Sequence, residues 1–213
     1  MSLKINEIYF SIQGESSHAG RPCIFIRLTY CNLRCTYCDT EYAFHEGYVM
    51  EISEIMDKIK KWNCNLVEVT GGEPLFQDEC IDLLNELKHL SYEVLLETGG
   101  SLPISDVPIE MIRIVDFKCP SSGMGKKNLW SIVNDLQRHD EVKFVIGDRE
   151  DFDWAREMIN KYSLNKKCTI LFSPAFGEIE PYLIVEWILE ENLPVRMQLQ
   201  MHKQIWSPDE KGV

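Results

Sequence analysis

The stretch that decides the fold is Cys31-Asn32-Leu33-Arg34-Cys35-Thr36-Tyr37-Cys38, which directly follows an apolar run from Cys23 to Tyr30. It brings three thiols together in one loop at the end of a predicted strand. Thiolates are soft ligands that hold iron–sulfur clusters or zinc. A cubane cluster with three cysteine ligands leaves one iron open for a small molecule, whereas a structural zinc ion requires a fourth ligand.

A zinc site would need a fourth ligand from nearby, and His45 and Asp39 are the only local candidates. No second cysteine pair follows at the spacing of a zinc ribbon. The dispersed cysteines are expected to be small buried hydrophobic residues: Cys23, Cys64, Cys80, Cys119 and Cys168. The loop therefore favours an open iron–sulfur cluster, with zinc as the alternative.

Outside this loop, short β-branched runs alternate with longer helical patterns. Strands are predicted at Cys23–Tyr30, Leu66–Thr70, Tyr92–Glu97, Met111–Phe117, Glu141–Ile146, Lys167–Phe172 and Val195–Gln200. Helices are predicted at Ile52–Trp62, from an Asp78 cap to Leu87, and at Leu129–Arg138, Asp151–Tyr162 and Ile179–Glu191. This alternation is typical of βα units on a parallel sheet.

The polar motifs come where the predicted strands end. The cysteines follow the first strand, Thr70-Gly71-Gly72-Glu73-Pro74 closes the second, and Glu97-Thr98-Gly99-Gly100 closes the third. Parallel sheets bind their ligands at the carboxyl ends of the strands. We therefore expect these motifs to share one site.

The composition is that of a globular protein, and 213 residues suffice for one domain, 1–213, with a large core. The net charge of −12 argues against a nucleic-acid partner, because phosphate binding requires a basic surface. No apolar run reaches the length of a membrane span, and the first residues show no signal-peptide pattern. We expect a cytoplasmic protein that acts on a small molecule.

Two motifs resemble those of the radical S-adenosylmethionine (SAM) superfamily: the three-cysteine loop with Tyr37 before its last cysteine, and Gly71-Gly72-Glu73-Pro74. The chain is further similar to the 7-carboxy-7-deazaguanine synthase family, from about Ile5 to its last residue. The segments that carry this similarity are Ile8–Glu15, Gly20–Pro22, Phe25–Leu28, Cys38–Thr40, Gln200–Lys203 and Gly212-Val213.

The resemblance implies an α/β fold, an incomplete (β/α) barrel of the radical SAM type with about six core strands in a parallel sheet. It implies a ring contraction in queuosine biosynthesis, in which a deoxyadenosyl radical takes the C6 hydrogen of 6-carboxy-5,6,7,8-tetrahydropterin. Ammonia leaves, and 7-carboxy-7-deazaguanine forms. The implied cofactors are a [4Fe–4S] cluster, SAM, which is regenerated, and Mg²⁺.

The implied partners are a second copy in a homodimer and a reducing electron donor such as flavodoxin or ferredoxin. Two rival functions stay open at this point. A glycyl-radical-enzyme activase would share the cysteine and Gly-Gly-Glu motifs but has no need for Gln13, Glu15 and Arg27. A non-catalytic iron–sulfur or zinc module would never cleave SAM.

By resemblance, Cys31, Cys35 and Cys38 bind the cluster and Thr40 contacts Mg²⁺. The substrate residues implied are Ile12, Gln13, Gly14, Glu15, Arg27, Thr70 and Val213. The SAM residues implied are Tyr37, Cys38, Asp39, Gly72, Glu73, Cys119, Pro120, Ser121, Ser173, Pro174, Ala175 and Phe176.

Each polar assignment has a structural alternative. Arg27 suits a carboxylate because a guanidinium binds it bidentately, but it could instead form a surface salt bridge. Glu15 and Thr40 could be capping residues, and Thr70 an ordinary strand residue. Cys119 is expected to be a buried neighbour of the site and not a fourth cluster ligand, because a fourth thiolate would block SAM.

Overall fold

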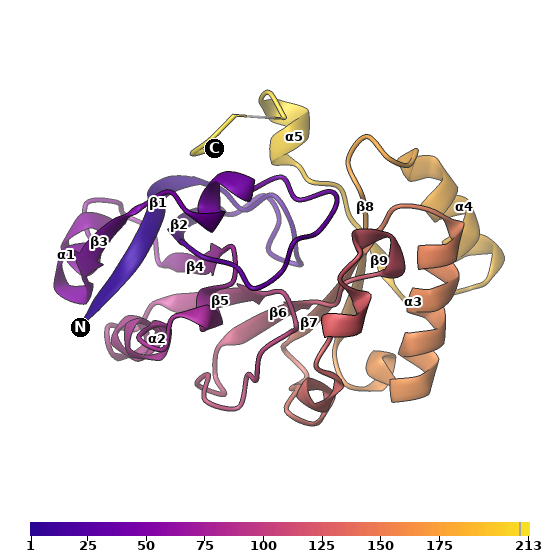
Figure 1. Cartoon of the computed structure of the whole chain (residues 1–213), viewed down its shortest axis with the longest axis horizontal. Coiled ribbons are helices and arrows are strands. Elements are labelled where there is room, and N and C mark those ends of the chain that lie inside the picture. Colours follow the sequence, from indigo (N-terminus) through magenta and orange to yellow (C-terminus); the bar gives the residue numbers. More distant parts are fainter. Residues whose placement is uncertain (209) are drawn as a thin grey trace.

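The computed structural model describes residues 1–208 and 210–213, and within them one nine-stranded sheet runs through the molecule (Figure 1). The strand order is β3-β1-β2-β4-β5-β6-β7-β8-β9. Neighbours from β2 to β9 are parallel, whereas β1 is antiparallel to both β2 and β3. The sheet is not closed, which confirms the predicted incomplete (β/α) barrel.

The strands are β1 (Ser2–Ile12), β2 (Pro22–Leu28), β3 (Tyr48–Glu51), β4 (Leu66–Gly71), β5 (Glu93–Thr98), β6 (Ile112–Asp116), β7 (Glu141–Ile146), β8 (Thr169–Pro174) and β9 (Arg196–Met197). The α-helices are α1 (Ile52–Ile59), α2 (Cys80–His89), α3 (Arg149–Tyr162), α4 (Pro181–Glu190) and α5 (His202–Ile205). Short 3₁₀ turns lie at Glu41–Phe44, Pro74–Phe76, Pro120–Ser122, Gly125–Lys127, Trp130–Asn134 and Leu164–Lys166.

Alternating side chains give the central strands two different faces. One face packs into the main core, with Ile26 on β2, Val69 on β4 and Phe144 on β7. The first residues of the opposite face form a second, small apolar cluster, Cys23, Phe25, Leu66, Leu95 and Ile114. Further along that second face the residues are polar or charged: Arg27, Glu68, Thr70, Glu97, Asp116 and Lys143. The opposite face therefore ends in a charged surface at the carboxyl ends of the strands.

The helices lie toward the two ends of the sheet, α1 and α2 at one end and α3 and α4 at the other (Figure 1). After β9 the chain runs back to α5, which lies above the middle of the sheet in this view, and the C-terminus lies toward β1 and β2. A backbone hydrogen bond of 2.9 Å from Met201 N to Gly14 O fixes this return. Among the described residues, no helix is both long enough and apolar enough to cross a membrane.

The sequence pattern does not predict β1, and the reason is a bulge. Pairing with β2 shifts between Ile5 and Glu7. The buried residues Leu3 and Ile5 therefore fall on odd positions, but the buried Ile8 falls on an even one. Strand prediction depends on unbroken alternation, which a bulge interrupts. The short edge strand β3 was also not predicted.

The predicted helix at Leu129–Arg138 is wrong, because only the 3₁₀ turn Trp130–Asn134 forms there. Trp130 stacks between Phe117 and Tyr162, with ring centroids 4.5 Å away on each side. The carbonyl of Asp135 accepts a hydrogen bond of 2.9 Å from Nη2 of Arg113, so that carbonyl is held by a distant side chain. Tertiary contacts override the helical pattern of this segment.

Two smaller differences concern element ends. The strand predicted at Val195–Gln200 forms only at Arg196–Met197. Gln198 lies beyond this pair, and its side-chain oxygen accepts a hydrogen bond of 2.8 Å from Ser16 N. The side chain of Asp78 does not cap α2, which begins at Cys80 after Glu79.

Candidate active site

A cavity of about 860 Å³ lies at the carboxyl ends of the strands and receives residues from almost every strand of the sheet. Its size is within the range of small-molecule sites. The three loop cysteines and the charged face of the sheet all line it. The motifs that the sequence predicted to share one site do so.

The three thiols form part of the wall of this cavity. Cys31, Cys35 and Cys38 are free and half-buried. Burial raises the pKa of the Cys35 thiol to about 11 and also raises that of Cys31. Metal ligation requires thiolates, so binding would oppose this shift. No three His, Cys, Asp or Glu side chains in 1–208 and 210–213 are arranged to hold a single metal ion.

The turn after β4 packs closely against the start of the cysteine loop. A Cβ at position 72 would lie 2.7 Å from Cβ of Cys31, so only glycine fits there. Tyr30, just before Cys31, has a positive φ of 79°. Its carbonyl accepts a hydrogen bond of 2.8 Å from Glu73 N. The two motifs are therefore joined through their backbones, and Tyr30 carries the strain of the sharp change in direction.

Glu73 is fully buried and does not line the cavity. Its carboxylate accepts hydrogen bonds from Thr98 Oγ1 at 2.9 Å, Gly99 N at 2.8 Å and Leu75 N at 3.1 Å. Burial raises the pKa of Glu73, and these hydrogen bonds oppose that rise. The hydrogen bonds of Glu73 thus connect the end of β4 to the end of β5 and stabilise the Gly72 turn.

The residues expected to contact SAM divide into two groups. Those in the cavity lining are Tyr37, Cys38, Asp39, Gly72, Ser173, Pro174, Ala175 and Phe176. Those outside it are Glu73, Cys119, Pro120 and Ser121. Cys119 is buried in the main core, as predicted for a neighbour of the site. Ser121 donates its backbone N–H at 3.0 Å and its hydroxyl to Asp151.

Two buried side-chain polar atoms in the described part of the chain have no hydrogen-bond partner: the Tyr37 hydroxyl and Oδ1 of Asp116. Both residues line the cavity. Buried polar groups are nearly always satisfied, so such orphans indicate a missing water or ligand. Three soft thiols beside a large polar cavity with unsatisfied groups fit an iron–sulfur cluster with SAM.

Arg27 lines the cavity between two partners on β1. Its Nε donates to Glu7 Oε1 at 2.8 Å and its Nη2 donates to the Tyr9 hydroxyl at 3.1 Å. Register explains the first contact, because Glu7 and Arg27 are directly opposite on β1 and β2. These bonds fix the guanidinium plane and leave its Nη1 side for a ligand. Arg27 does form an ion pair with Glu7, but a largely buried one, because the two side chains are 14% and 19% exposed.

Gln13 is buried, and its side chain is engaged at both ends. Its Nε2 donates to Glu68, and its Oε1 accepts from Glu15 N at 2.8 Å. The Glu15 carboxylate accepts from Lys143 Nζ at 3.0 Å and from Gln200 Nε2 at 3.0 Å. Gln13 therefore shapes the loop, and it lines the cavity together with Ile12, Gly14, Glu15, Thr70 and Val213.

Thr40 lines the cavity, with its Oγ1 3.8 Å from Sγ of Cys38. It precedes the turn Glu41–Phe44, but its side chain makes no capping hydrogen bond. Its neighbour Asp39 is held by Lys203, whose Nζ lies 2.6 Å from Oδ2. The capping alternative for the Thr40 hydroxyl is thus not what the structure shows.

The chain is similar in sequence to proteins of a known family. The model of the radical SAM superfamily matches residues 25–116, which include the three cysteines and Gly72. A 7-carboxy-7-deazaguanine synthase from Koribacter versatilis is 45% identical over 99% of this chain and 100% of its own length. One from Chlorobaculum tepidum is 47% identical over 99% of this chain and 97% of its own length.

The chain belongs to the 7-carboxy-7-deazaguanine synthase family of radical SAM proteins. The crystal structure of QueE from Escherichia coli has the same fold, with a TM-score of 0.80 at 22% identity over 95% of each chain. The resemblance seen in the sequence is confirmed.

Sequence reasoning missed several charged residues of this synthase-family cavity: Glu7, Glu68, Asp116 and Lys143. A signal for the strand residues exists in the sequence. Glu68 and Lys143 each lie between two apolar neighbours inside a strand, in Leu66–Gly71 and Glu141–Ile146, and Asp116 ends the strand Ile112–Asp116 after two apolar residues. A charge inside a fully buried strand requires partners, and such residues often mark functional sites.

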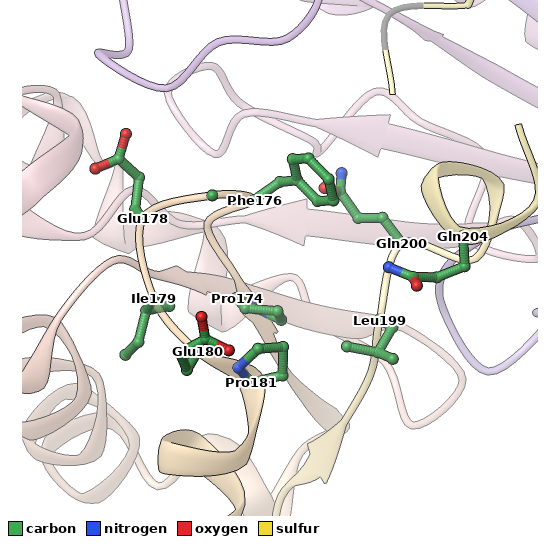
Figure 2. Close-up of a pocket in the computed structure, with 10 residues that line it drawn as sticks. Pro174, Phe176, Glu178, Ile179, Glu180, Pro181, Leu199, Gln200 and Gln204 are labelled. Atoms are coloured by element: carbon green, nitrogen blue, oxygen red, sulfur yellow. The ribbon is translucent and has the colours of Figure 1, made fainter. Parts of the chain in front are cut away.

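A second, smaller cavity of about 270 Å³ lies beside the first, between the loop after β8 and the segment before α5. Figure 2 shows Phe176 and Gln200 pointing toward one another across it. These two residues line both cavities. They therefore form a partition between the main cavity and this side cavity.

Proposed function

We propose that this chain is a radical SAM lyase that converts 6-carboxy-5,6,7,8-tetrahydropterin to 7-carboxy-7-deazaguanine, with loss of ammonia. The single observation that supports this most is the shared cavity. It is lined at one side by the three thiols and Gly72, and at another by Arg27 and Glu15. The curated relatives that bear this activity in their names match the chain over nearly its whole length.

Cys31, Cys35 and Cys38 would hold the cluster, with Gly72 leaving room for SAM beside it. When bound, the cluster and SAM supply the radical that takes the C6 hydrogen of the pterin. Arg27, already oriented by Glu7 and Tyr9, would bind the pterin carboxylate as a bidentate cation. Glu15, held by Lys143 and Gln200, would accept hydrogen bonds from N–H groups of the ring.

Thr40 would contact a Mg²⁺ ion that also binds the substrate carboxylate. A hydroxyl is a hard oxygen ligand, and Mg²⁺ keeps several waters, so one such contact suits the ion. The Thr40 hydroxyl lines the cavity, makes no capping hydrogen bond and lies 3.8 Å from Sγ of Cys38, which supports this assignment. The residues of Ser173–Phe176 and Tyr37 would enclose the adenosine end of SAM.

The remaining expectations concern partners and location. We expect one domain that acts in the cytoplasm as a homodimer and receives its electron from a small reducing protein such as flavodoxin or ferredoxin. Helix α4 offers an apolar stripe for a second copy, Tyr182, Val185 and Leu189, exposed by 58%, 38% and 69%. Light scattering of the purified protein tests the dimer.

The decisive experiment is anaerobic reconstitution with iron and sulfide, followed by mass spectrometry of the products from SAM and the carboxylated pterin. Formation of 7-carboxy-7-deazaguanine and ammonia supports the proposal. SAM cleavage without any pterin product would favour a different radical SAM substrate, such as the protein glycine of an activase. No SAM cleavage by a fully loaded cluster would favour a non-catalytic module.

A further inference from the structure

Lys143 is a buried cation that contacts carboxylates from three separate parts of the chain. Its Nζ lies 3.0 Å from Glu15 Oε2 in the loop after β1 and 3.3 Å from Asp116 Oδ2 on β6. It also pairs with Glu97 on β5. The Lys143 side chain is only 7% exposed. No other cation in the described part of the chain contacts Glu15 or Glu97 within salt-bridge distance.

The fold places Lys143 where it can reach all three. Asp116 is its register partner on the adjacent strand β6. Glu97 lies two strands away on the same face of the sheet, and the loop with Glu15 lies over that face. The lysine thus occupies the centre of the charged surface inside the cavity.

The three carboxylates that Lys143 contacts lie toward two ends of the cavity. Glu15 is at the proposed pterin end, where Gln200 Nε2 also binds it. Glu97 accepts a hydrogen bond of 3.3 Å from Thr70 Oγ1, another residue of that end. Asp116 is at the proposed SAM end, where it pairs with Lys118 at 3.0 Å and its Oδ1 is unsatisfied. Lys143 is therefore the contact that joins the two ends.

Electrostatics explain why one lysine matters here. Three carboxylates around one point repel each other strongly in a site of low dielectric constant. The same contacts raise the pKa of Lys143 well above its usual value, although burial opposes this. Burial alone would raise the pKa of Glu15, but Lys143 and Gln200 lower it. The positive charge of Lys143 offsets the repulsion among these carboxylates and holds them close together.

We propose that Lys143 is a positioning residue that holds Glu15 and Glu97 against the pterin and links them to Asp116 at the SAM end. This inference rests on the proposed function. Lys143 acts through the carboxylates and not on the reacting atoms. Without it the carboxylates move apart or take up a proton, so the pterin is bound weakly and out of line with the radical. The radical then takes its hydrogen atom from the chemical reductant or the buffer in place of the pterin, and 5′-deoxyadenosine is released in place of being recycled.

The test compares Lys143→Met and Lys143→Gln with Lys143→Arg in the reconstituted protein with SAM. The measurements are iron content, the pterin Kd, and the ratio of released 5′-deoxyadenosine to 7-carboxy-7-deazaguanine. We expect unchanged iron, a Kd raised roughly tenfold or more, because buried charges lose their partner, and a ratio raised severalfold. Lys143→Arg retains the cation and should recover much of both properties.

Arg113→Lys is the matched control, because Arg113 forms a buried ion pair with Asp140 that does not line the cavity. This variant should lower the melting temperature but leave the pterin Kd and the product ratio unchanged. If Lys143→Met and Lys143→Gln keep wild-type Kd and ratio, the inference is wrong. It is equally wrong if Arg113→Lys changes both to the same extent. A wild-type protein that makes no deazaguanine product would instead overturn the proposed function.

Discussion

Gly14 and His202 approach so closely that a Cβ at position 14 would lie 2.6 Å from Nδ1 of His202. Gly14 follows β1 near the start of the chain, and His202 begins α5 near its end. The hydrogen bond from Met201 N to Gly14 O is part of the same contact. Glycine at position 14 thus allows α5 to close one side of the cavity.

Gly14→Ala should displace α5 and weaken pterin binding, because backbone and ring atoms of His202 leave no room for a methyl group. We expect the pterin Kd to rise roughly tenfold with normal iron content, since closing segments contribute to orientation. Anaerobic titration of pterin measures the effect. Gly20→Ala is the control: it has a positive φ of 89° but open space around it, so it tests backbone strain alone. Equal losses in both variants would contradict the steric argument.

Arg27→Ala should abolish high-affinity pterin binding without altering the cluster spectrum. Loss of one partner of a desolvated charge pair costs about 2–5 kcal/mol, which is roughly a thirtyfold to several-thousandfold loss of affinity. The variant also leaves Glu7 without its cation, so thermal unfolding has to be measured in parallel.

Glu7→Gln separates these two effects. It removes the Glu7 charge but keeps Arg27 in the cavity, so the pterin Kd should change far less than in Arg27→Ala. If both variants lose affinity equally, Arg27 supports the structure and does not bind the substrate.

Cys35→Ala should lose the cluster and all SAM cleavage, because the remaining two thiols cannot hold a cubane that is otherwise bound by three. Wild type should bind about four irons per chain after reconstitution. Cys168→Ala is the control, since Cys168 is buried in the main core away from the loop. It should cost roughly 0.5–3 kcal/mol of stability and keep its iron. Full turnover by Cys35→Ala would contradict the assignment of the loop.

The sequence was sufficient for the parts of this site that depend on local spacing. The cysteine loop, the Gly72 turn and Arg27 were predicted, and the cavity contains all of them. The assignment of Glu73 to SAM shows the limit. Its motif position is next to Gly72, but its carboxylate turns inward to Thr98 and Gly99, which the spacing of the motif cannot reveal.

The contacts of Lys143 and Glu68 could also not be predicted from the sequence, because their partners are far away in the chain. Lys143 contacts Glu15, which is 128 residues away in the chain. Such pairs depend on how strands are ordered in the sheet, and local patterns do not encode that order. The strands themselves were predicted well where alternation was unbroken, as at Glu141–Ile146, and failed at β1, where a bulge breaks it.

Glu68→Gln should make stability less dependent on pH. Burial, and then the charges of Glu97 and Glu15, raise the pKa of Glu68 well above its usual 4.5. The folded protein therefore retains a proton that the unfolded chain releases, and stability falls as pH rises from 4.5 toward the folded pKa. The glutamine does not titrate and still offers an oxygen to Gln13. The variant should gain about 1 kcal/mol or more over wild type at pH 8, relative to pH 5.

Urea unfolding of the protein at both pH values provides the measurement. Glu110→Gln is the control, because Glu110 is an exposed acid whose pKa is lowered by Lys88 and so titrates below this range. Its pH dependence between 5 and 8 should equal that of wild type. A Glu68→Gln variant with the wild-type slope would show that Glu68 is ionised in the folded protein.

Mg²⁺ and pterin should bind cooperatively, and Thr40→Ala should remove the cooperativity while the cluster spectrum stays unchanged. The Thr40 hydroxyl faces the cavity without a capping bond, 3.8 Å from Sγ of Cys38. A neutral hydroxyl alone is a weak ligand, so the ion needs the substrate carboxylate to complete its site. Its role would be to orient the pterin, since Mg²⁺ has no redox chemistry of its own.

Linkage makes this prediction strict, because Mg²⁺ must tighten pterin binding by the factor with which pterin tightens Mg²⁺ binding. Calorimetric titrations in both orders measure the two factors without any turnover. Thr40→Ser retains the hydroxyl and should retain the coupling, which separates ligation from the loss of a methyl group. Independent binding of Mg²⁺ and pterin to the wild type would remove Thr40 from the metal site. It would leave its hydroxyl as a neighbour of Cys38 only.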